Sequence, residues 1–183
     1  QAADSLGDPT ARYQGRLTLN PLAHMDIVGA MLMVMTGFGW AKPVEFDPRY
    51  FKNPKNDTLK VSLAGPAANL FLVFLAMLVR AIMFKTGHLS TGVNQLLIYM
   101  IRFNVWFAFF NLIPIPPLDG YRIITHILPG KMAWEFEDFV YRYERYMILV
   151  LMLLVFAGIT NIIIVPLANI YLSIVSGILG LIF

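Results

Sequence analysis

The distribution of charged residues divides the chain into long apolar runs and short polar loops. Asp, Glu, Lys and Arg are absent from residues 146–183 and from three shorter runs, 27–41, 61–79 and 103–118. A helix needs roughly 20 predominantly apolar residues to cross the hydrocarbon core of a bilayer. The final run is long enough for two crossings, with a possible turn at Gly158. We therefore expect about five transmembrane helices, at residues 27–41, 61–84, 95–118, 143–160 and 164–183.

The apolar runs lack the alternation of apolar and polar residues that a membrane β-barrel requires. Backbone groups in lipid must be hydrogen-bonded within their own segment, so the pattern predicts an all-α polytopic membrane protein. Two segments differ. The alternation from Arg16 to Leu19 predicts a short strand within residues 13–24, and the prolines and aromatics of residues 41–53 predict an extended or re-entrant loop. We expect a single domain, 1–183, divided into residues 1–26, a core of residues 27–123 and C-terminal helices in residues 124–183.

Composition and charge support a membrane location. Hydrophobic residues make up 58% of the chain and charged residues only 14%, against about 25% in soluble domains. The chain has no cysteine, which excludes disulfides and cysteine-based zinc sites. Residues 42–60 contain five basic residues and residues 119–145 contain four. With five crossings both loops lie on one side of the membrane, and Arg12, Arg16, Arg80 and Lys85 lie on the other. The excess predicts that both loops face the cytoplasm.

The strongest candidate chemistry lies in residues 111–120, which read NLIPIPPLDG. Three prolines remove backbone donors at the end of an apolar helix and break its hydrogen-bond ladder. The freed backbone groups need protein or water, and such an end can offer an extended edge to a peptide. We predict that Pro114 and Pro116 contribute to this substrate edge and that Asp119, at the tip of the helix, is functional. The alternative is that Asp119 only ends a helix at the membrane surface.

A second motif, residues 64–69, reads AGPAAN. Small residues at successive helical positions allow two helices to approach closely, which is the simplest role for Gly65 and Ala68. Asn69 adds an amide that lipid could not hydrogen-bond. We assign Asn69 to the candidate substrate-binding residues, with a hydrogen bond between helices as the alternative.

Both motifs resemble those of the site-2 protease family of intramembrane zinc metalloproteases. The segments LGDPTARYQGRLTLNPLAHMD and GWAKPVEFDPRYF are also similar to its compact bacterial branch, which lacks inserted PDZ and CBS domains. The likeness covers roughly residues 2–123 in four motifs that follow the family's order. It implies a multi-pass protein of the bacterial cell membrane, with its active site toward the cytoplasm, that cleaves the transmembrane segments of membrane protein substrates.

The resemblance also implies a zinc site. In that family the zinc is held by two histidines of an H-E-x-x-H helix and by the aspartate of an L-D-G motif, here Asp119, and the glutamate is the general base. Asn111 is implied as the residue that holds the substrate strand or stabilises the oxyanion. The chain contains no H-E-x-x-H motif. We expect the helix that carries this motif immediately before Gln1, which would bring the total to about six transmembrane helices. His126, if helical, is about 10.5 Å along the axis from Asp119, too far to share its zinc.

Two other classes of protein stay open. A noncatalytic, protease-like binding or scaffold protein would keep the helices and the substrate edge without holding zinc. A small transporter would have polar residues on several helices and broken helices in corresponding halves. The sequence shows one such break and no internal repeat. The expected partners are the lipid bilayer and a membrane protein, and we expect no nucleic acid.

Overall fold

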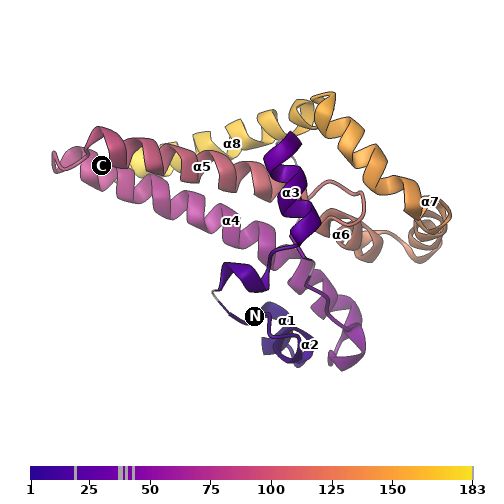
Figure 1. Cartoon of the computed structure of the whole chain (residues 1–183). Helices are drawn as coiled ribbons and strands as arrows, with labels where there is room; N and C mark the ends of the chain where they lie inside the picture. Colours follow the sequence, from indigo (N-terminus) through magenta and orange to yellow (C-terminus); the bar gives the residue numbers. More distant parts are fainter. Residues whose placement is uncertain (19, 37–38, 40, 43, 183) are drawn as a thin grey trace. The chain divides into compact units, whose positions relative to one another are not determined.

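The computed structural model describes residues 1–18, 20–36, 39, 41–42 and 44–182. Within these residues the regular structure is helical, and the β-type pairing is limited to an isolated antiparallel bridge between Met25 and Ala41. The all-α fold expected from the sequence is therefore confirmed. The chain forms two compact units, Gln1–Val61 and Ser62–Phe183, which are described separately (Figure 1).

The first unit consists of short helices and loops. Its elements are α1 (Ala2–Ser5), α2 (Thr10–Tyr13), the 3₁₀ turn η1 (Pro21–Ala23), α3 (Ile27–Thr36), the 3₁₀ turn η2 (Pro48–Tyr50) and the first turns of α4 (Pro54–Lys85).

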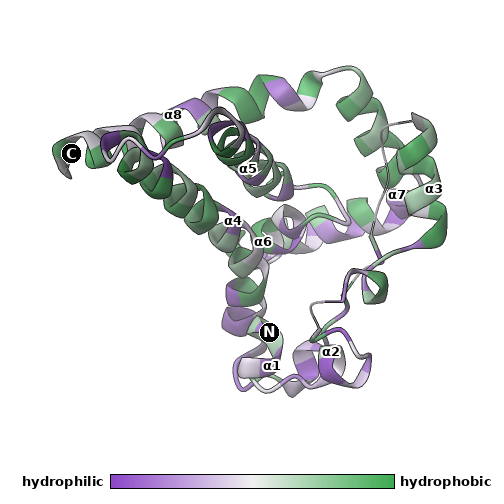
Figure 2. Cartoon of the chain, turned by 60° about the vertical axis from the view of Figure 1, so that its left-hand side comes forward, coloured by the Kyte–Doolittle hydropathy of each residue, from purple (hydrophilic) through white to green (hydrophobic). Residues whose placement is uncertain are grey.

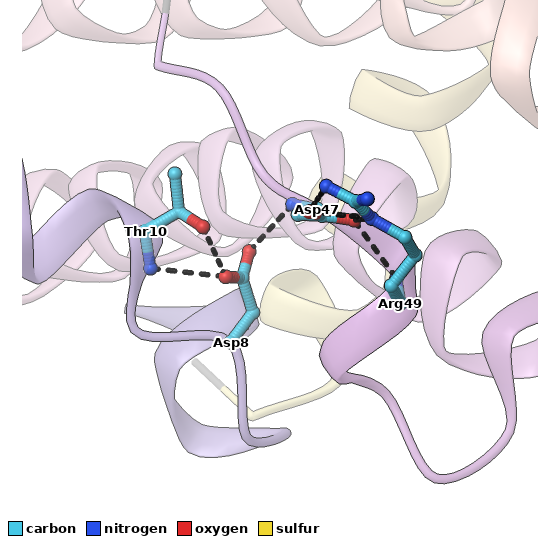
Figure 3. A network of polar contacts seen from close by, with 4 residues as sticks. All are labelled: Asp8, Thr10, Asp47 and Arg49. Carbon is cyan, nitrogen blue, oxygen red and sulfur yellow. Dashed lines mark hydrogen bonds and ion pairs between the residues drawn. The ribbon is translucent and has the colours of Figure 1, made fainter.

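A buried carboxylate joins two distant segments of this unit (Figure 3). Asp8, which is 0% exposed, accepts hydrogen bonds from the N–H and the hydroxyl of Thr10 and from the N–H of Asp47 at 2.9 Å. Asp47 in turn caps η2 by accepting from the Arg49 N–H. Burial alone would raise the pKa of Asp8, but the three hydrogen bonds outweigh it and hold that pKa below its usual value. The ionised form of Asp8 therefore stabilises this unit.

The prediction of a strand within residues 13–24 is wrong for the described residues. Residues 17 and 18 form a bend instead, and Leu19 lies outside the described residues. The Arg16 guanidinium donates to the carbonyl of Ala23, and Asn20 caps η1 with its side chain. These local side-chain bonds compact the segment and compete with extended pairing.

Residues 41–53 are largely without regular structure, as the prolines predicted. Lys42 donates its backbone N–H to the His24 carbonyl at 2.9 Å, next to the bridge between Met25 and Ala41. Pro43 lies outside the described residues. Whether this loop re-enters the membrane stays a prediction.

The second unit is built on three long helices: most of α4, α5 (Thr91–Asn111) and α8 (Ile159–Ile182). Buried Val73, Val105 and Ala168, one from each helix, pack together. The Tyr171 hydroxyl on α8 donates to the Leu70 carbonyl on α4 at 2.7 Å. Hydrophobic residues run along all three helices (Figure 2). Each is long and apolar enough to cross a membrane.

Three helices meeting these criteria, within the described residues, are fewer than the five crossings expected. The ten residues of α3 extend only about 15 Å, half of a hydrocarbon core. In α7 (Gly130–Phe156) the first half is charged, and the uncharged part from Tyr146 to Phe156 extends about 16 Å. The expected break near Gly158 is present, because α7 ends at Phe156 and Gly158 has a φ of 71°.

Candidate functional site

The backbone at Asp119 is fixed from both sides. After α5 ends, residues 112–118 form turns, and Asp119 is the first residue of α6 (Asp119–Ile127). Leu118 is 9% exposed and packs with Ile113 and with Ile164 of α8. Gly120 is buried, and a Cβ there would collide with the carbonyl oxygens of residues 112 and 113. Only glycine therefore lets α6 start this close to the end of α5.

The Asp119 carboxylate faces the second sequence motif. A Cβ built on Gly65 of α4 would lie 3.3 Å from Oδ2 of Asp119. The segments AGPAAN and NLIPIPPLDG, far apart along the chain, thus meet at this carboxylate. The sequence assigned Gly65 to helix packing, so this contact was missed, and no signal in a single sequence could have found it.

The environment of Asp119 favours a cation. Its side chain is half-buried, and within the described residues it forms no hydrogen bond or salt bridge. Burial raises the pKa of Asp119, and the positive charge of Arg122 offsets part of that effect. A carboxylate taken partly out of water without a hydrogen-bonded partner is stabilised in its charged form by a bound cation. Asp119 therefore fits the role of a single metal ligand.

Asn111 is the last residue of α5, and one amide hydrogen is already in use. Its Nδ2 donates to the Phe107 carbonyl at 3.0 Å, within its own helix. An amide NH₂ has two donors and its oxygen accepts, so the second hydrogen and Oδ1 are available for a ligand.

The proline-broken turn offers a substrate carbonyls rather than N–H groups. Pro114, Pro116 and Pro117 have no N–H. The other four N–H groups of residues 112–118 all donate within the turn or to the end of α5, namely those of Leu112, Ile113, Ile115 and Leu118. The expectation that this break frees both carbonyls and N–H groups is therefore corrected: acceptors remain, and donors do not. Pro114 is exposed and Pro116 is half-buried.

Polar groups of α4 lie near the contact with Asp119. Asn69 is one turn after Gly65 and hence on the same face of the helix. It is half-buried, with no hydrogen bond recorded in the described part of the chain. One turn before Gly65, Ser62 is 1% exposed and its hydroxyl lacks a partner. Pro66 has no N–H for the Ser62 carbonyl, which loses its usual helical donor. Sequence reasoning missed Ser62, although the Pro66 four residues later marks it.

The histidine side chains that form hydrogen bonds do so with nearby backbone carbonyls. His126 donates from Nδ1 to the Arg122 carbonyl at 2.7 Å, and His24 donates from Nε2 to the Thr18 carbonyl. Across the described ranges no group of three His, Cys, Asp or Glu side chains could hold a metal ion. The described residues thus provide one fitting ligand, Asp119, and no group of three that would complete a metal site.

Comparison with known proteins identifies the class. Residues 79–156 match the family model described as Peptidase family M50. The chain is 44% identical to YwhC, a candidate zinc metalloprotease of Bacillus subtilis, over 132 residues. The matched region covers 69% of this chain and 60% of YwhC. It is 32% identical to Rip2, a candidate zinc metalloprotease of Mycobacterium tuberculosis, over 131 residues. The matched region covers 67% of this chain and 49% of Rip2. No solved structure gives a significant match.

The helices and these matches define a multi-pass membrane protein of the metallopeptidase type. The chain belongs to peptidase family M50, the site-2 proteases, as the motifs of residues 64–69 and 111–120 predicted. It spans about 60% of the length of YwhC and half that of Rip2.

Proposed function

We propose that this protein is an intramembrane zinc endopeptidase that cleaves the transmembrane segments of membrane protein substrates. The observation that carries the proposal is the half-buried Asp119 carboxylate, which meets α4 at Gly65 and has no hydrogen-bonded or ion-paired partner among the described residues. Membership of family M50 and the description of YwhC and Rip2 as candidate zinc metalloproteases support zinc as the cation.

Asp119 would supply one of the protein ligands of the zinc. The other ligands and the general base would come from an H-E-x-x-H helix, a motif that the 183 residues do not contain. Zinc, when bound, supplies Lewis acidity toward water and a peptide carbonyl. The carboxylate of Asp119 contributes a negative charge held in a partly dehydrated place, where its attraction for a cation is stronger than in water.

The turn at residues 112–118 would bind the substrate in an extended form. Because its N–H groups are already bonded, an extended peptide would donate its own N–H groups to carbonyls of the turn, such as those of Pro114 and Pro116. The remaining amide hydrogen of Asn111 would serve the substrate carbonyl, and Asn69 would contact the substrate from α4. These roles rest on placement, because Asn111 is the last residue of α5 and Asn69 lies one turn after Gly65 in α4.

The orientation follows from charge. With α4 and α5 as consecutive crossings, residues 42–60 and 119–145 still share one side, as they did with five crossings. Nine basic residues in these two loops favour the cytoplasmic side. The site at Asp119 would then face the cytoplasm of a bacterial cell.

The proposal is tested with Asp119→Asn in the intact natural protein, purified in detergent. Zinc content is measured by mass spectrometry, and cleavage is measured on tagged single-span membrane proteins. We expect both zinc and cleavage to be lost, because the neutral amide is a poor zinc ligand. Asp138→Asn is the matched control, since Asp138 forms a surface salt bridge with Arg142 on α7. Normal zinc content and cleavage in Asp119→Asn would refute the proposal.

A noncatalytic, protease-like scaffold is the second candidate. It is favoured by the lack of a three-residue metal-binding group within the described residues. The same measurement separates the two, because a scaffold would contain no stoichiometric zinc as isolated from cells.

A further inference from the structure

We propose that Gly65 is the positioning residue of Asp119: the missing side chain lets the carboxylate seat its Oδ2 against α4 at residue 65, with Oδ1 farther from that residue. The inference rests on the proposed function, because Asp119 has to be a metal ligand for its position to matter. It departs from the simpler interpretation of Gly65 as a contact between helix backbones.

The contact itself is specific. Among the described residues, Oδ2 of Asp119 is the one atom outside the local helical turns that a Cβ on Gly65 would approach within 4 Å, at 3.3 Å. Oδ1 is therefore farther away. Among the described residues, no backbone atom of another helix lies within that distance, so the contact at residue 65 is with a carboxylate and not with a helix backbone. By contrast, a Cβ added to Gly177 or Gly180, in the C-terminal half of α8, would meet no atom of the described residues within 4 Å outside the local helical turns.

The backbone of Asp119 has little freedom to move away from α4. A separation of 3.3 Å is tighter than ordinary van der Waals contact, so a methyl group on residue 65 would require Asp119 to shift by a few tenths of an ångström. The backbone of Asp119 is held on one side by buried Leu118 and on the other by Gly120, which abuts the turn after α5. The shift would therefore fall on the carboxylate, by rotation about its side-chain bonds.

Rotation of a metal ligand has a measurable consequence. Groups that orient a ligand typically change metal affinity 10- to 100-fold when they are altered. The unpartnered, buried Ser62 hydroxyl one turn away shows that this part of α4 carries polar capacity not used by the described residues. The part of α4 that faces Asp119 thus has no side chain at residue 65 and an unbonded hydroxyl, among the described residues, one turn earlier.

The test compares Gly65→Ala with Gly177→Ala and Asp119→Asn in the intact natural protein. Zinc affinity is measured by competition with a chromophoric chelator, and the midpoint of thermal unfolding is measured on the metal-free proteins. Alanine has the higher helix propensity, so neither glycine variant is expected to lower the midpoint. We expect Gly65→Ala to weaken zinc binding at least tenfold, Gly177→Ala to leave it within twofold, and Asp119→Asn to abolish it.

Each other outcome is decisive. Zinc affinity within twofold of the natural protein in Gly65→Ala, together with loss of zinc in Asp119→Asn, would overturn the role of Gly65 and leave the proposed function intact. A lowered midpoint in metal-free Gly65→Ala would show that the helix is disturbed rather than the carboxylate, which also overturns the inference. Zinc retained by Asp119→Asn would remove the proposed function and this inference with it.

Discussion

Gly120 offers the sharpest test of how the fold places Asp119. In Gly120→Ala the new methyl group would collide with backbone oxygens of residues 112 and 113, which are not the ends of flexible side chains and cannot swing aside. Overpacking by one methyl group costs about 1–3 kcal/mol, and up to about 1 kcal/mol is regained from the helix propensity of alanine. We therefore expect a net destabilisation of about 2 kcal/mol.

The assay is thermal unfolding in detergent micelles, followed by circular dichroism. For a chain of this size about 2 kcal/mol lowers the unfolding midpoint by about 4–8 °C. Gly92→Ala is the matched control, because Gly92 is also the second residue of its helix and its added Cβ would meet nothing within 4 Å. Gly92→Ala should leave the midpoint unchanged or raise it. Equal midpoints for the two variants would refute the steric explanation of Gly120.

Two further predictions concern packing and pH. Ile164→Ala removes a side chain that is 1% exposed in the cluster next to Asp119, so it should destabilise the protein by about 2–5 kcal/mol, whereas Ile163→Ala, at a position 56% exposed, should change little; chemical denaturation compares them. The pKa of Asp8 is lowered on folding, so its contribution is present above the unfolded pKa and is lost as pH falls below about 4. The protection factor of the Asp47 amide, which is the intrinsic exchange rate at each pH divided by the observed rate, should fall over that interval, and Asp8→Asn should remove this pH dependence. A protection factor that stays constant down to about pH 3 would contradict the prediction.

The number of membrane crossings shows one limit of hydropathy. The sequence correctly located α4, α5 and α8, because each contains an uninterrupted apolar run of sufficient length. At residues 27–41 and 143–160 it predicted two more crossings, whereas α3 and the uncharged part of α7, as far as they are described, each extend only about 15–16 Å. At the start of the chain, the alternation from Arg16 to Leu19 predicted a strand. Instead, Arg16 donates to the Ala23 carbonyl and the Asn20 side chain accepts from the Leu22 N–H, and these local bonds favour turns.

The candidate site was predicted in part. The proline pattern singled out residues 111–119 because a broken helix end in a membrane needs compensating partners. The same pattern did not show which backbone groups stay free, since the four N–H groups of the turn find acceptors only after the turn has closed. The role of Asn111 stays a prediction, and the bond from its amide to the Phe107 carbonyl depends on the helical geometry of α5.

The amino-acid order alone determined that this chain is helical and enters a membrane, because lipid leaves a polar backbone no other way to satisfy its hydrogen bonds. It also determined where α5 must break, through three prolines that cannot donate. The tertiary structure alone decided that residue 65 of one helix meets the carboxylate that follows another. That contact depends on how α4 and α5 pack and on the close approach of α6 to the end of α5 that Gly120 permits. Neither of these arrangements can be read from the local sequence.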